Sequence, residues 1–198
     1  MSARRSSAAL LLGALIASAG ALGQGANPFG ISAFSATMVM TMPGGRSLST
    51  KIYVLAGKVR TDLPGGGAGG GYSLVLSQAQ EAYMVMAGHC MMMPFKSTRP
   101  NPFTMKGSVK TEQLGSDTVD GHPTTIVELT LRDAAGHTTK MKAWRATDLQ
   151  QFPLRVEIPT SNGTVREEFH DLSLTPPAAD LFERPSNCMS MPSFGAPH

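Results

Sequence analysis

The sequence predicts a mainly β protein whose short antiparallel strands form a meander, a curved sheet or a barrel. Three observations predict this fold class. Apolar and polar residues alternate with a period of two in several segments, which is the pattern of a half-buried strand. These segments recur about every 8–12 residues with turn sequences between them. Helical periodicity is almost absent, so little helix is expected beyond the N-terminus.

Residues 1–23 have the pattern of a secretory signal peptide. Arg4 and Arg5 supply the positive charge, Ala8–Ala19 the apolar core, and small residues precede Gln24. An uncleaved N-terminal anchor is the alternative. Export predicts a periplasmic or secreted protein, with residues 24–33 as a flexible linker.

Length, composition and charge indicate the number of domains and argue against disorder and nucleic-acid binding. A chain of 198 residues predicts one domain, over 34–186, followed by a C-terminal tail at 187–198. A hydrophobic fraction of 41% argues against wholesale disorder. The net charge of +3 falls to +1 without Arg4 and Arg5, so nothing in the charge predicts nucleic-acid binding.

The first strand shows the alternation best, because Phe34, Ala36 and Met38 share one face while Ser35 and Thr37 share the other. Between the strands we expect a flexible Gly-rich hairpin loop at 64–71 and an irregular segment at 87–107. The predicted strands are 34–42, 48–55, 58–63, 72–77, 81–86, 108–114, 123–132, 137–145, 152–158 and 164–172.

Turn residues separate these strands. Pro43-Gly44-Gly45 and Ala56-Gly57 predict tight turns. Asp120-Gly121 is a strong turn signal, and Asn162-Gly163 predicts a type I′ hairpin in which both central residues have positive φ.

Three parts of the chain resemble a known family. They are FSATMVMTMPGG with KIYVLAGKVRTD, then residues 114–130 with HTTKMKAWRATDLQQFPLRVE, and finally TPPAADLFERPS at 175–186. Together they resemble the outer-membrane-lipoprotein-carrier (LolA/LolB-like) superfamily, and more closely its small exported branch of unknown function. The resemblance implies a curved antiparallel sheet, like an unclosed barrel, whose concave face holds an apolar ligand such as an acyl chain. The chain lacks the longer helical segments of those carriers and adds a Met-rich insertion.

The sequence offers few catalytic signals. Glu168 and His170 share one face of a predicted strand, but no nucleophile or second carboxylate is placed beside them. We therefore expect a non-enzymatic protein without a cofactor. The expected partner is an apolar small molecule or a lipidated protein, with transient contact with the envelope membrane. The sequence does not fix the oligomeric state.

Methionines at alternate strand positions allow three interpretations. Met is flexible and polarizable, so it fills irregular cores or lines adaptable ligand surfaces, and its thioether suits Cu(I). As an apolar ligand face we expect Met38, Met40, Leu74, Leu76, Met84 and Met86. The alternative, a periplasmic copper site, uses His89, Cys90, Met91, Met93, Cys188, Met189 and Met191.

Cys90 and Cys188 are the only two cysteines. An oxidising compartment favours their pairing, and the alternative is two free buried thiols. A disulfide would hold the C-terminal tail and would also remove both thiolates from the copper site.

Overall fold

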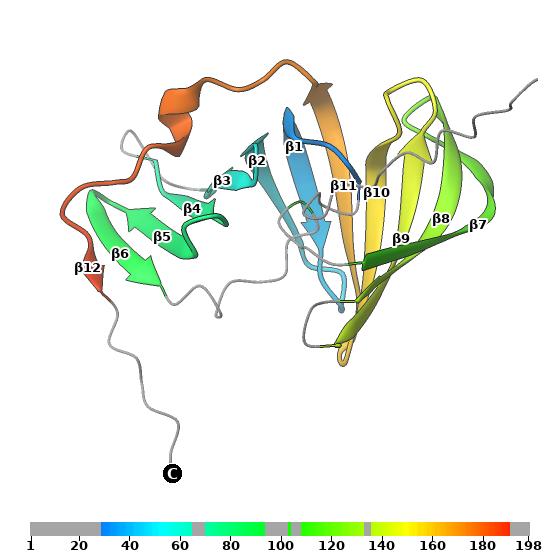
Figure 1. The fold of residues 1–198 in the computed structure, drawn as a ribbon, viewed down its shortest axis with the longest axis horizontal. Helices are drawn as coiled ribbons and strands as arrows, with labels where there is room; N and C mark the ends of the chain where they lie inside the picture. The colour runs from blue at the N-terminus through cyan, green and yellow to red at the C-terminus, as the bar shows by residue number, and fades with distance from the viewer. Residues whose placement is uncertain (1–28, 65–69, 94–102, 104–107, 133–135, 191–198) are drawn as a thin grey trace, which may run out of the picture.

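Over the residues that the structure describes, the protein forms one 12-stranded curved sheet and one short 3-10 helix (Figure 1). The computed structural model describes residues 29–64, 70–93, 103, 108–132 and 136–190. Among these residues, no helix has the length and apolar character needed to cross a membrane. The elements are β1 Ala33–Thr41, β2 Ser47–Leu55, β3 Lys58–Asp62, β4 Tyr72–Leu76, β5 Glu81–Met86, β6 His89–Met93, β7 Ser108–Val119, β8 His122–Arg132, β9 Thr138–Ala146, β10 Phe152–Thr160, β11 Gly163–Ser173, η3 Ala179–Phe182 and β12 Met189–Ser190.

The sheet joins two meanders. Its order is β12-β6-β5-β4-β3-β2-β1-β11-β10-β9-β8-β7, so the pairing of β1 with β11 connects the two runs. All neighbours are antiparallel except β12, which lies parallel to β6. Three of the connections are two-residue turns with positive φ at both residues, as type I′ turns require: Ala56-Gly57, Ala87-Gly88 and Asp120-Gly121.

The inner face of the sheet is the face that carries Phe34, Ala36 and Met38. These side chains are buried at 0%, 6% and 5% exposure and belong to one large apolar cluster. The cluster gathers residues from strands as far apart as β3 and β7, which requires the sheet to curl around it. The predicted curved and unclosed antiparallel sheet is therefore confirmed (Figure 1).

The opposite, outer face carries a second and smaller cluster over β4 to β6. Leu74 and Leu76 pack there with Tyr83 and Cys90, and Phe182 of η3 covers them. The segment after β11 thus packs on the outer surface of these strands through Phe182 (Figure 1).

Strand formation exceeds the expectation in three places. Residues 89–93, expected to be irregular, form β6, because the Ala87-Gly88 turn brings them back against β5. Residues 189–190 of the expected tail form β12. Strand β7 continues to Val119 through an irregularity between Gln113 and Gly115.

The predicted turn centred on Asn162 and Gly163 is wrong by one residue. Thr160 pairs with Gly163, so the loop residues are Ser161 and Asn162, and of Asn162 and Gly163 only the glycine has positive φ, at +121°. A Cβ at this glycine would lie 3.1 Å from the Cβ of Pro43. The β1–β2 turn therefore lies against this hairpin.

Candidate functional site

One row of in-register residues connects the packed core to the edge of the sheet. Directly paired residues of neighbouring strands lie on the same face, so the row shows which side chains share the inner face. It runs through Ala36, Ile52, Thr61, Ser73, Met84, Met91 and Met189. The inner face thus begins as a closed core at β1 and ends as methionine at β5, β6 and β12.

The methionine end of this face is open. Met84 and Met91 are half-buried, whereas Met86 is 52% and Met189 62% exposed. Met93 follows Met91 by two residues on the same strand face and is also half-buried. We call Met84, Met86, Met91, Met93 and Met189 the methionine face.

The six residues expected to line one apolar surface lie on two. Met38 is buried in the inner cluster and Met40 packs against it, while Met84 and Met86 belong to the methionine face. Leu74 and Leu76 pair with Tyr83 and Glu81 on the outer face and lie beneath the C-terminal segment. The expectation of a shared face was wrong for the two leucines, because alternation along one strand does not say which face turns inward.

Two aromatic rings from outside the strands fill the centre of the inner face, which the sequence reasoning missed. Phe103 lies 4.6 Å from the ring of Phe34 and 5.6 Å from that of Phe169, and Phe29 lies 5.4 Å from Phe103. Both added rings follow Asn-Pro in the sequence, a repeat that offered a signal. The chain's own rings therefore occupy the middle of the inner face, and the open apolar surface lies at the methionine end.

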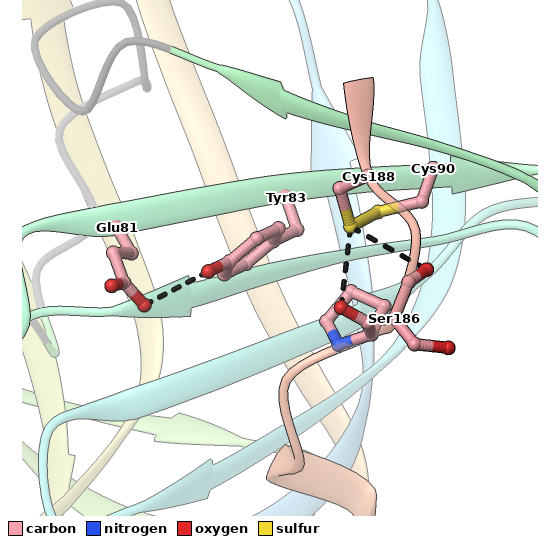
Figure 2. The surroundings of a disulfide bond; sticks show 6 residues. Glu81, Tyr83, Cys90, Ser186 and Cys188 are labelled. Atoms are coloured by element: carbon pink, nitrogen blue, oxygen red, sulfur yellow. Dashed lines mark hydrogen bonds between the residues drawn. A yellow bond between two sulfur atoms is a disulfide. The ribbon is translucent and has the colours of Figure 1, made fainter. Parts of the chain in front are cut away.

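A disulfide between Cys90 and Cys188 holds the C-terminal segment on the outer face (Figure 2), as expected. The two Cα atoms are 4.5 Å apart. The Cys188 sulfur lies 3.3 Å from the carbonyl oxygen of Pro185 and 4.0 Å from that of Ser186. Because a disulfide sulfur carries no proton, these are close contacts without a donated hydrogen.

A polar network ties the same segment to β5. The Tyr83 hydroxyl donates to Oε2 of Glu81 at 2.9 Å (Figure 2), and Arg184 Nε lies 2.8 Å from the same oxygen. Burial, followed by the hydrogen bond to Glu81, raises the pKa of Tyr83. Nearby, a pocket of about 250 Å³ opens between the end of β4 and η3, lined by Lys58, Leu76, Gln78, Ala79, Phe182 and Arg184.

The disulfide removes both thiolates from the alternative copper site. Cys90 belongs to the outer cluster, whereas its neighbour Met91 lies on the inner face, and His89 is exposed. Met191 lies outside the described residues. Within the described part of the chain, no three His, Cys, Asp or Glu side chains are grouped to hold a metal ion. The Cys-containing donor set therefore has no support in the structure.

Glu168 and His170 are engaged elsewhere. Glu168 accepts from Arg155 at 2.8 Å, and His170 Nδ1 lies 2.7 Å from a carboxylate oxygen of Asp120. Neither is arranged to act on the other as an acid–base pair.

Comparison with known proteins gives matches in structure alone. No protein-family model and no curated protein sequence matches the chain. Among solved structures, the lipoprotein LppX from Mycobacterium tuberculosis is 12% identical, with a TM-score of 0.42 over 73% of this chain and 88% of that protein. LprF from Mycobacterium bovis is 16% identical, with a TM-score of 0.41 over 76% of this chain and 90% of that protein. A LolA-superfamily protein from Nitrosomonas europaea is 10% identical, with a TM-score of 0.40 over 77% and 90%.

Proposed function

We propose that this chain is an exported, non-enzymatic binding or carrier protein that holds an apolar ligand on the inner face of its sheet. The ligand class is a lipid, an acyl chain or a lipidated protein. The observation that carries the proposal is the methionine face, a partly exposed apolar surface that an uncharged row of paired residues joins to the packed core.

The chemistry of this surface suits acyl chains. Methionine side chains are unbranched and adaptable, so they can pack against ligands of varied shape. The row that reaches them contains no charged residue, so an acyl chain lying along it would desolvate no ion. The N-terminal export pattern and the disulfide both fit an oxidising envelope compartment.

Displacement of a bound fluorescent dye by fatty acid tests the proposal. A dye that reports apolar sites should bind the folded protein and be displaced by a long-chain fatty acid. Met86→Glu places a charge on the methionine face at an exposed position, so it should weaken binding at least about tenfold without unfolding the protein.

The matched control is Met92→Glu. Met92 is 37% exposed and pairs with Tyr83 on the outer face, so this variant should bind as the unaltered protein does. Failure of the folded protein to bind dye or fatty acid would overturn the proposal, and so would equal weakening by the two variants.

A further inference from the structure

The methionine face contains three thioethers that the sheet register brings side by side. Met84 of β5 is the direct partner of Met91 of β6, and Met91 is the direct partner of Met189 of β12. Neighbouring strands lie about 4.8 Å apart, and directly opposed Cβ atoms about 4.5–5.5 Å apart. Three flexible side chains on one face at this spacing can turn their sulfur atoms toward one point.

The disulfide fixes the third of these residues. Cys90 and Cys188 each precede one of the methionines by one position, and their bond lies on the outer face. Because successive side chains of a strand point to opposite faces, the bond on the outer face holds Met91 and Met189 together on the inner face. Strand β12 has only two residues, so backbone pairing alone would hold Met189 weakly.

We propose that Met84, Met91 and Met189 form a binding site for a soft monovalent cation, Cu(I) or Ag(I). Thioethers are uncharged soft ligands that select Cu(I) over hard cations such as Mg²⁺ and Ca²⁺. This site goes beyond the proposed apolar-ligand function. It differs from the Cys-containing set because it includes Met84 and needs no thiolate, so it is compatible with the intact disulfide.

Neighbouring side chains can extend the donor set. Met86 and His89 are direct partners in the adjacent row, and Met93 lies two positions beyond Met91 on the same strand face. The site is open to solvent through Met189, which gives a cation a path of entry.

Silver titration of the oxidised protein tests the site. Ag(I), unlike Cu(I), is not a reductant and therefore does not reduce the disulfide, and thiol counting before and after the titration confirms that neither cysteine is free. We expect one tight site by calorimetry in chloride-free buffer, with sulfur ligands in the X-ray absorption spectrum.

Leucine replacements separate thioether chemistry from apolar contact. The triple variant Met84→Leu, Met91→Leu and Met189→Leu keeps the surface apolar but removes the three sulfur donors. Loss of a residue that only orients a metal ligand lowers metal affinity roughly 10–100-fold. Because this variant loses three ligands themselves, its affinity for Ag(I) should fall by more than that. The control Met92→Leu, on the outer face, should bind as the unaltered protein does.

Fatty-acid binding by the unaltered protein in metal-free buffer tests the proposed function separately from this site. Loss of Ag(I) binding in the triple variant, with unchanged Ag(I) binding in Met92→Leu, supports the cation site. Equal Ag(I) affinity of the triple variant and the unaltered protein would overturn it, as would absence of tight Ag(I) binding by the unaltered protein. Neither of these two results would affect the apolar-ligand proposal, which is measured without metal.

Discussion

Breaking the Cys90–Cys188 bond should destabilise the protein strongly. The bond closes a loop of 98 residues, for which the chain-entropy model gives about 4.7 kcal/mol. A domain of ordinary stability has about 5–15 kcal/mol in total, so the bond accounts for a large part of it. Packing gives a second reason to expect destabilisation. The segment held by the bond places Phe182, which is 2% exposed, over Leu74 and Leu76.

Urea unfolding of the oxidised protein and of the double variant Cys90→Ala/Cys188→Ala measures this effect. With a slope of about 2 kcal/mol per molar urea, a loss of about 4.7 kcal/mol lowers the midpoint by about 2 M. The reduced unaltered protein should show a similar shift, and an apolar dye should gain access to the outer cluster. A shift below about 0.5 M in both samples would refute the reasoning, since it would mean that the segment stays in place without the bond.

Three further predictions concern single side chains. Gly163→Val should cost about 1–3 kcal/mol in thermal unfolding, because φ is +121° and the new Cβ would meet Pro43 at 3.1 Å; an unchanged melting temperature would show that this hairpin relaxes freely. Phe103→Ala should cost about 3–5 kcal/mol, because its ring is 2% exposed among the rings of the inner cluster; a urea midpoint equal to that of the unaltered protein would place this ring outside the core. Burial and the bond to Glu81 raise the pKa of Tyr83 above its ordinary value of 10.0, so its contribution to stability is fully present below that pH and is lost as the pH rises through the raised value. Tyr83→Phe should remove this alkaline component from the pH dependence of the urea midpoint, and an identical alkaline slope in both proteins would contradict the assignment.

The sequence by itself determined the strands whose side chains alternate. At 34–42 a period of two placed Phe34, Ala36 and Met38 on one face, and these residues are buried together. Asp120-Gly121 marked its turn because its two residues tolerate positive φ, which few others do. In these segments, local conformational preference and burial favour the same structure. The sequence of each segment was therefore enough to predict its structure without knowledge of its neighbours.

Residues 89–93 carried no such signal. The run HCMMM has no alternation, and it forms β6 because β5 offers unpaired backbone groups across the Ala87-Gly88 turn. Asn162-Gly163 had a strong local signal, yet the pairing of β10 with β11 places the loop one residue earlier. In both cases hydrogen bonds to a neighbouring strand decided the structure.

The composition of the candidate site was decided by tertiary structure in the same way. Alternation shows that Leu74 and Leu76 share a face and that Met84 and Met86 share a face, but only the register between β4 and β5 shows that these faces are opposite. Likewise, Met84 and Met189 are 105 positions apart in the chain and become neighbours of Met91 through pairing on both sides of β6. A one-residue change in register would move every side chain of a strand to the other face, and register depends on contacts that no single segment contains.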